Sequence, residues 1–246
     1  MDSDRGHCVV MPITLGMFPH IRGLTYISFA SGSLSTTSAN SRTVAFTPPA
    51  GTTLAVFVMT ARHNASAATW NTPTFNGASL TAASTFAQYV TRFSTGIYYV
   101  VNPTTGSSQN LVYSTTSANW ASTYCAVYYF SGQPASPIGT TGAANQSSVT
   151  THTVTMDPAD TGIPFIIGAV CTAYQSGGSN SDNTFTSLSN LQQDGGGTHT
   201  GNNAHAVFSN QFALSANPGS TSFSATKPTS WTSSDGRTVM VEIKSK

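Results

Sequence analysis

Short apolar runs recur along the chain between Gly, Pro, Asn and Ser, while the spacing of an amphipathic helix is nearly absent. β-Branched and aromatic residues dominate these runs, which is typical of strands. The pattern predicts strands over residues 26–34, 43–47, 53–62, 73–75, 80–89, 96–102, 109–115, 123–131, 149–156, 164–174, 185–192, 204–214, 221–226 and 237–244. These strands are sufficient for two packed sheets.

Two local patterns give sharper predictions. Asn76-Gly77 lies between apolar stretches and favours a type I′ turn, because both residues tolerate positive φ angles. The last strand alternates, so we expect one buried and one wet face. The buried set is Val239, Val241 and Ile243, and the wet set is Met240, Glu242 and Lys244.

The organisation of the chain follows from these elements. Residues 139–151 are rich in Ser, Thr and Gly and are expected to form a long connection. No internal repeat stands out, and a β-sandwich of this length commonly forms one domain. We therefore predict an N-terminal arm over residues 1–23 and a single domain over residues 24–246. The domain is expected to be a two-sheet antiparallel β-sandwich of the jelly-roll or immunoglobulin-like type.

The first 23 residues mix apolar and polar positions without a strand or helix period. They are either a disordered start or an arm that orders on a neighbouring subunit. Acids before the apolar stretch and Pro12 within it fit a secretory signal poorly. The arm would bury Val9, Val10, Met11, Ile13, Leu15, Met17 and Phe18.

Charge is scarce. Only 7% of the residues are charged and the formal net charge is +1, whereas roughly a quarter is usual for soluble domains. The chain therefore offers few basic residues that could bind nucleic-acid phosphates or acidic membranes. No apolar run is long enough for a membrane-spanning helix. Sheet edges are often guarded by lysine, and the few lysines here lie near the C-terminus. We expect the edges to be covered by neighbours or by loops.

The three cysteines have neither metal nor redox spacing. Cys125 and Cys171 lie within apolar strand patterns and are expected to be small buried residues, with a disulfide between them left open. No cofactor is implied.

No motif for a nucleophile, phosphate loop or metalloprotease is present. A glycosidase needs two suitably placed carboxylates, but Asp157 and Asp160 read as turn formers and nothing singles out a pair. No catalytic residue is therefore assigned. His199 and His205 flank a short loop and are weak metal candidates, with His152 or Asp194 as a further ligand. A polar hairpin pair is the simpler interpretation.

Three tryptophans, Trp70, Trp120 and Trp231, sit beside Asn, Thr or Ser in expected loops. Flat rings flanked by amides can stack on sugars, so these residues are possible glycan contacts. Rim positions around the core are the alternative for each of them.

Three segments carry a resemblance: residues 73–81 (PTFNGASLT), 97–106 (IYYVVNPTTG) and 126–132 (AVYYFSG) leading to Pro137-Ile138. Together they resemble a recurrent β-sandwich domain of phage structural proteins and large bacterial surface proteins, over roughly residues 53–138. The resemblance implies a surface or virion module without catalytic residues. The bacterial version carries a signal peptide, flanking domains and a wall anchor, so the phage version is the closer analogy.

The leading expectation is therefore a non-enzymatic virion structural protein: a capsid decoration, head-fibre or tail component. Its partners would be the major capsid or tail protein and sister copies in a homo-oligomer, without nucleic acid or membrane insertion. The alternative is a carbohydrate-binding surface or receptor-recognition module, which would be extracellular and could contact a host glycan. An enzyme such as a glycan hydrolase is the third hypothesis, disfavoured by the shortage of acids.

Overall fold

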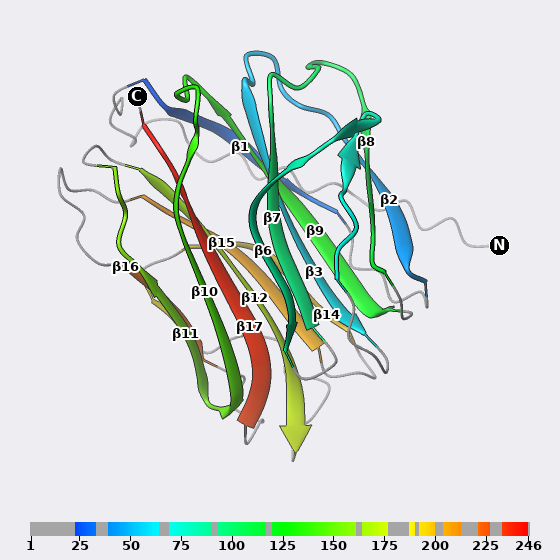
Figure 1. The fold of residues 1–246 in the computed structure, drawn as a ribbon, viewed down its shortest axis with the longest axis vertical. Coiled ribbons are helices and arrows are strands. Elements are labelled where there is room, and N and C mark those ends of the chain that lie inside the picture. Colours follow the sequence, from blue (N-terminus) through cyan, green and yellow to red (C-terminus); the bar gives the residue numbers. More distant parts are fainter. Residues whose placement is uncertain are drawn as a thin grey trace.

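A computed structural model describes residues 23–32, 39–63, 69–89, 93–116, 120–160, 164–176, 187–189, 192–199, 204–212, 221–226 and 233–245. The described chain is all β (Figure 1), which confirms the predicted fold class. The strands are β1 (Thr25–Ser31), β2 (Ser41–Phe46), β3 (Leu54–His63), β4 (Thr74–Phe75), β5 (Ala78–Ser79), β6 (Thr81–Tyr89), β7 (Phe93–Val101), β8 (Gln109–Ser114), β9 (Trp120–Ser131), β10 (Ile138–Val149), β11 (Thr151–Met156), β12 (Phe165–Ser176), β13 (Ser187–Ser189), β14 (Gln192–His199), β15 (Ala204–Phe212), β16 (Thr221–Thr226) and β17 (Ser233–Ile243).

The described strands form four antiparallel sheets. Inner sheet 1 has the order β1-β9-β3-β7-β6 and inner sheet 2 the order β10-β17-β12-β15-β14. Outer sheet 1 has the order β2-β8-β4-β5 and outer sheet 2 the order β11-β16-β13. We call β1–β9 unit 1 and β10–β17 unit 2, since each unit contributes one inner and one outer sheet.

Three apolar cores separate these layers. The central core joins the two inner sheets through alternate residues such as Val56 of β3 and Ile167 of β12. The intervening β3 residues, among them Phe57, point into outer core 1, against outer sheet 1. Ile166 of β12 likewise points into outer core 2, against outer sheet 2. The layers therefore run outer sheet 1, inner sheet 1, inner sheet 2, outer sheet 2.

The predicted two-sheet sandwich corresponds to the two inner layers, and the outer sheets explain one error. The last strand was expected to have a wet face, yet Met240 and Glu242 are both buried. Outer sheet 2 covers that face, with Met240 in outer core 2. Strands buried on both sides read as continuous apolar runs, and alternation alone does not show whether a polar position meets water or a further layer.

The expected connection over residues 139–151 is also wrong, because β10 spans most of it. Between Ile138 and Val149, β10 has no large apolar side chain, and it packs through glycines. A Cβ added at Gly139 would collide with the Glu242 carboxylate, and one at Gly142 would lie 3.1 Å from the Thr155 carbonyl oxygen. Because its glycines let β10 lie close to neighbouring strands, β10 does not need the alternating apolar residues by which a strand is recognised in a sequence.

The two units have the same strand order. Replacing β1, β9, β3, β7 and β6 by β10, β17, β12, β15 and β14 turns inner sheet 1 into inner sheet 2. Outer sheets 1 and 2 correspond in the same way, with β2, β8 and β4 matching β11, β16 and β13. Unit 2 therefore repeats unit 1, a repeat that the sequence did not reveal.

The edges of the inner sheets are interrupted rather than charged. A register irregularity lies in the pairing of each edge strand: β1 near Tyr26, β6 near Ala82, β10 near Ile138 and β14 near Gln193. Such bulges twist an edge away from the flat ladder that a further strand needs. The described inner edges thus have a protection that requires neither lysine nor a covering neighbour.

The predicted turn at Asn76-Gly77 is confirmed. Both residues have positive φ angles, 51° and 78°, and they connect β4 to β5. Among the described residues, no helix is long and apolar enough to cross a membrane.

Candidate functional site

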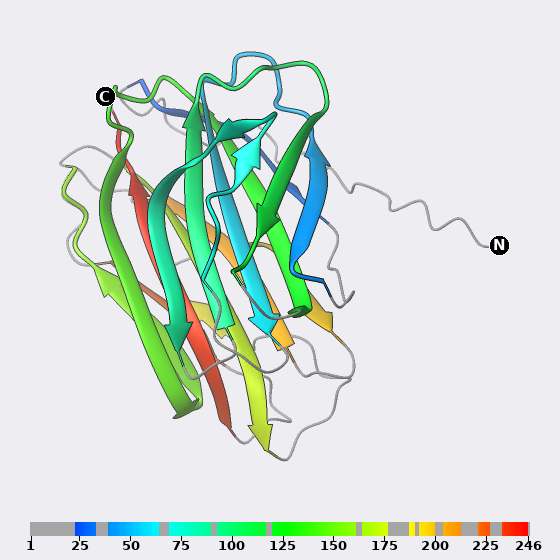
Figure 2. The same ribbon diagram turned by 45° about the vertical axis from the view of Figure 1, so that its right-hand side comes forward.

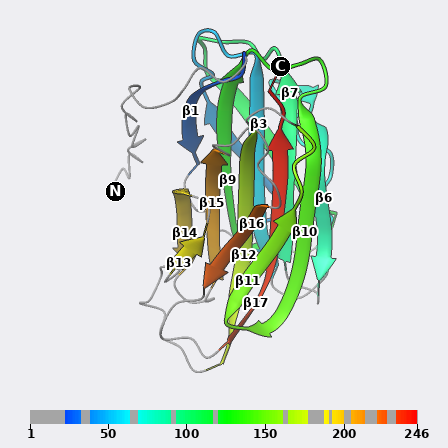
Figure 3. The same ribbon diagram turned by 90° about the vertical axis from the view of Figure 1, so that its left-hand side faces the viewer.

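Outer sheet 2 faces the viewer in Figure 3, and its exposed side carries hydroxyl side chains. Thr151 lies opposite Thr226, Thr153 opposite Ser224 and Thr155 opposite Ser222. The hydroxyl oxygens of Thr153 and Ser224 are 3.0 Å apart, and those of Thr151 and Thr226 are 3.2 Å apart. The alternate residues Val154 and Met156 point into outer core 2, so the strands present only Ser and Thr on this face.

Outer sheet 1 lies on the opposite side of the molecule (Figure 2), and its sequence gives it a similar face. Five of its eight outward positions are Ser or Thr, and the cross-strand pairs place on this side Ser41, Thr43, Ala45, Thr74, Ser79, Asn110, Val112 and Ser114. Val112 is 38% exposed, which makes it one of the two large apolar side chains exposed in the described chain. The described outward positions of both outer sheets are therefore small, neutral and hydroxyl-rich.

A hydroxyl network fixes one end of unit 1. Nη1 of Arg42 donates to the Thr123 carbonyl oxygen at 3.2 Å and to the Tyr113 hydroxyl at 3.5 Å. The Thr123 hydroxyl donates to the Thr60 carbonyl oxygen at 3.0 Å. These bonds tie β2, β8, β9 and β3 together, so Arg42 serves to hold the two sheets of unit 1 at this end.

Burial keeps the groups beside this network neutral. Burial, followed by the nearby Cys125 thiol, raises the pKa of Tyr113 far above its ordinary value. Burial also raises the pKa of Cys125 to about 11. A thiol that stays protonated is a poor nucleophile, so Cys125 has the chemistry of a core residue.

In unit 2, a buried carboxylate holds several segments together near the end of β17. Glu242 accepts hydrogen bonds from the backbone N–H groups of Thr140, Ala159 and Asp160 at 2.7, 3.0 and 2.7 Å. Asp160 in turn accepts from the backbone N–H and the hydroxyl of Ser245. Asp160 therefore holds the chain after β17, and Glu242 connects β17 to β10 and to the chain after β11.

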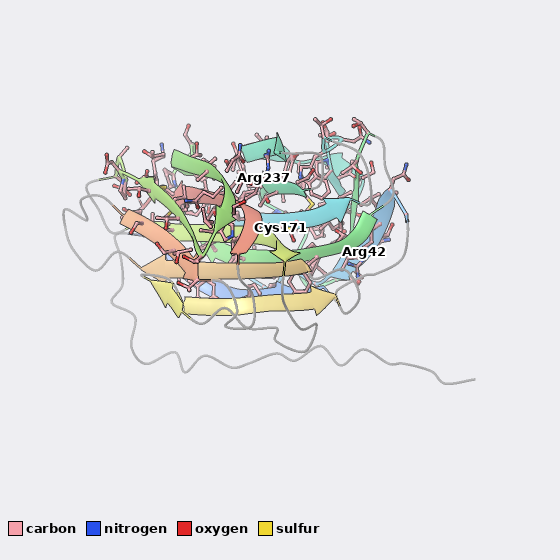
Figure 4. All side chains as sticks on the ribbon, turned by 90° about the horizontal axis from the view of Figure 1, so that it is seen from below. Arg42, Cys171 and Arg237 are labelled. Atoms are coloured by element: carbon pink, nitrogen blue, oxygen red, sulfur yellow. The ribbon has the colours of Figure 1, made fainter. Side chains whose placement is uncertain are left out.

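The central core contains a buried arginine. Arg237 of β17 is fully buried and pairs across the ladder with Cys171 of β12. Figure 4 shows the two residues together in the interior and Arg42 apart from them. Burial lowers the pKa of the Arg237 guanidinium to about 10, and the nearby Cys171 opposes this shift.

Neither described cysteine is in a disulfide. Cys125 lies in outer core 1, whereas the Cys171 thiol is 3.9 Å from the Ala61 carbonyl oxygen. The two strands belong to different sheets, and their thiols lie in different environments. Cys8 lies outside the described residues.

The histidine candidates do not face each other in the ladder. His199 pairs with Ala204, and His205 pairs with Thr198, so the two histidines stand on neighbouring rungs. His152 is buried in β11. Within the described residues, no three His, Cys, Asp or Glu side chains are grouped so as to hold a metal ion.

The tryptophans are separated by the fold. Trp70 packs edge-on against Tyr113, with ring centroids 5.9 Å apart, and borders outer core 1. A Cβ at Gly96 would lie 3.2 Å from two atoms of the Trp70 ring, so this glycine allows the indole to approach the sheet. Trp120 begins β9 opposite His63. Trp231 and the arm residues Val9, Val10, Met11, Ile13, Leu15, Met17 and Phe18 lie outside the described residues.

No family model, curated protein or solved structure matches the chain.

Proposed function

We propose that the protein is a non-enzymatic structural component of a bacteriophage virion, acting as a capsid decoration, head-fibre or tail protein on the particle surface. It works by assembly with the major capsid or tail protein and with sister copies in a homo-oligomer. The observation that supports this most is the pair of neutral, hydroxyl-rich outer faces on opposite sides of the layered fold.

Such faces suit contacts between proteins. Hydroxyl groups both donate and accept hydrogen bonds, so two faces of this kind can satisfy each other without matched charges. The Thr methyl groups and Val112 add apolar area, and burying them loses no ion hydration. Two opposite faces allow one molecule to contact a neighbour on each side, which is what a surface layer of repeated subunits requires.

The bulged edges of the inner sheets indicate which surfaces are used for attachment. Bulged edges disfavour addition of a further strand, so we assign attachment to the outer faces and to the arm rather than to main-chain pairing. With few charges on these surfaces, ionic strength should have little effect on assembly.

Assembly can be tested by placing one charge on each face. Thr43→Lys and Thr153→Lys put an ammonium group onto outer sheets 1 and 2, where an apposed neutral face would have to desolvate it. We expect each variant to shift the concentration for self-association at least about tenfold, measured by sedimentation velocity. Thr104→Lys, in the exposed loop after β7, is the matched control. Unchanged association in both face variants, with all three folded, would overturn the role of the faces.

The arm is tested separately. Deletion of residues 1–22 should abolish attachment to the native particle while leaving the circular dichroism spectrum unchanged. Particles isolated from the source should carry the full-length chain in repeated positions when imaged by electron microscopy. Full binding by the truncated protein would refute the arm, and turnover of a glycan by the purified protein would refute the non-enzymatic assignment.

A further inference from the structure

The repeat extends from strand order to the register of individual residues. In unit 1, β3 and β7 form nine consecutive pairs, from Leu54–Val101 to Arg62–Phe93. In unit 2, β12 and β15 form nine consecutive pairs, from Phe165–Phe212 to Ala173–Ala204. The outer ladders agree as well, since β2 with β8 and β11 with β16 each form six uninterrupted pairs.

One irregularity also recurs at an equivalent place. The β6–β7 ladder shifts after its second pair, between Ala82 and Ser84. The β14–β15 ladder also shifts after its second pair, between Gln193 and Gly195. Strand order alone is shared by many sandwiches, but a bulge at the same rung is a feature of a particular fold. The agreement therefore favours descent of both units from one unit.

The packing between the units follows an exchange rule. Across the central core β17 packs against β6 and β7, and its counterpart β9 packs against β14 and β15. Likewise β12 packs against β7, and its counterpart β3 packs against β15, the counterpart of β7. The counterparts β3 and β12 also pack against each other. β6 also packs against β10, whereas the described parts of β1 and β14 are packed less closely. In a twofold interface, residue i meets j and j meets i, which is the arrangement that these pairs follow.

We infer that the chain is an intramolecular dimer. Unit 2 is a diverged second copy of unit 1, and the inner faces of these two copies form a homotypic interface. The central core is that interface, and it includes the aromatic group of Tyr26 and Phe130 from unit 1 and Phe165 from unit 2. The Phe130 and Phe165 rings are 5.1 Å apart, and the Tyr26 ring is 5.8 Å from that of Phe130.

Each unit is closed on itself. A Cβ at Gly132, just after β9, would collide with the carbonyl oxygen of Gly23, just before β1. In unit 2 the N–H of Lys244, just after β17, donates to the Pro137 carbonyl oxygen, just before β10. The last strand of each unit therefore ends beside its own first strand, and only the segment between Gly132 and Pro137 connects the units. The interface should not need that covalent connection.

Cleavage tests this inference on the full-length chain. A protease recognition sequence is inserted after Ala135, and the purified protein is cut, unfolded in urea and diluted. We expect the two fragments to reassemble into a 1:1 complex with the elution volume and circular dichroism spectrum of the uncut protein. The matched control carries the same insertion after Thr104, between β7 and β8, where the cut divides both sheets of unit 1. The inference is overturned if the fragments cut after Ala135 do not recombine, or if the control recombines equally well.

A rearranged chain gives an independent test. The C-terminus lies near the start of β1 in all three ribbon views (Figures 1, 2 and 3), so a short linker can join unit 2 to unit 1 in reversed order. A permutant that runs from Ser136 through Lys246, the linker and Leu24 to Ala135 should keep the cooperative unfolding of a chain in the original order that likewise lacks residues 1–23. A molten or aggregated permutant would contradict an exchangeable pair of units, whatever becomes of the proposed virion role.

Discussion

The two units share strand order and register but fill their outer cores differently. In unit 1 Phe57 lies between Phe46 and Phe75, with ring centroids 6.3 and 4.8 Å away. The equivalent position in unit 2 is Gly168, because Phe57 and Gly168 pair with the corresponding residues Val127 and Met240. Aliphatic residues and methionines form the described part of outer core 2. One backbone thus accepts two different sets of core side chains.

The buried polar groups differ as well. Tyr124 and Tyr129 of β9 occupy the positions of Arg237 and Glu242 in β17. No Asp or Glu occurs between Arg5 and Met156, so the described polar contacts of unit 1 are made by hydroxyls, amides and Arg42, whereas in unit 2 a carboxylate accepts from backbone N–H groups. The strand register that the two units share therefore does not depend on which polar groups connect the ends of their strands.

The largest effect is expected in the aromatic outer core. Phe57→Ala should lower the free energy of unfolding by about 3 to 5 kcal/mol, because it removes a buried ring and leaves a cavity. Met240→Ala, in the smaller outer core 2, should cost about 2 to 4 kcal/mol. Urea denaturation measures both, with exposed Val112→Ala as the control. A greater loss for Met240→Ala would reverse the contrast between the units.

Loss of the buried carboxylate should come next. Glu242→Ala removes the acceptor of three backbone N–H groups and should cost about 2 to 4 kcal/mol, moderated by water reaching the partly exposed donors. Tyr129→Phe at the equivalent position of unit 1 should cost less than about 1 kcal/mol. Hydrogen exchange of the Thr140 and Asp160 amides should accelerate only in the Glu242 variant. Equal effects at the two positions would show that Glu242 has no special role.

Alkaline pH should weaken unit 1 through Cys125. Burial raises the pKa of this thiol from 9.0 to about 11, so the unfolded chain loses the proton first. The stability that the neutral thiol provides is present below pH 9 and is lost as the pH rises towards 11. The stability difference between the wild type and Cys125→Ala should therefore shrink by about 2 to 3 kcal/mol over this interval. A constant difference in urea titrations would contradict a protonated buried thiol.

The smallest effect is expected in the hydroxyl network. Tyr113→Phe removes the group that lies between Arg42 and Thr123, and should cost about 1 kcal/mol. Arg42→Lys keeps the charge but loses the geometry of the guanidinium, and should cost a similar amount. Thermal unfolding can measure both. No change in either variant would mean that water replaces the network.

The repeat had a faint trace in the sequence. Ser41–Phe46 reads SRTVAF and Thr151–Met156 reads THTVTM, and each is followed two residues later by a proline, Pro48 or Pro158. The trace is weak because a sandwich constrains the alternation of burial far more than the identity of each side chain. The glycines of β10 and the residues at the ends of each ladder followed no such pattern, so neither the strand nor the equivalence of the units could be predicted.

The sequence by itself determined the all-β class, the positions of the central strands and the turn at Asn76-Gly77, because these depend on local periodicity and on the backbone preferences of single residues. Only the tertiary structure decided that Met240 and Glu242 meet a further layer, that the two histidines stand on different rungs, and that two units share one core. These depend on which distant strands come to lie together. A local sequence pattern predicts that a side chain is buried, but it does not predict which other residues that side chain packs against.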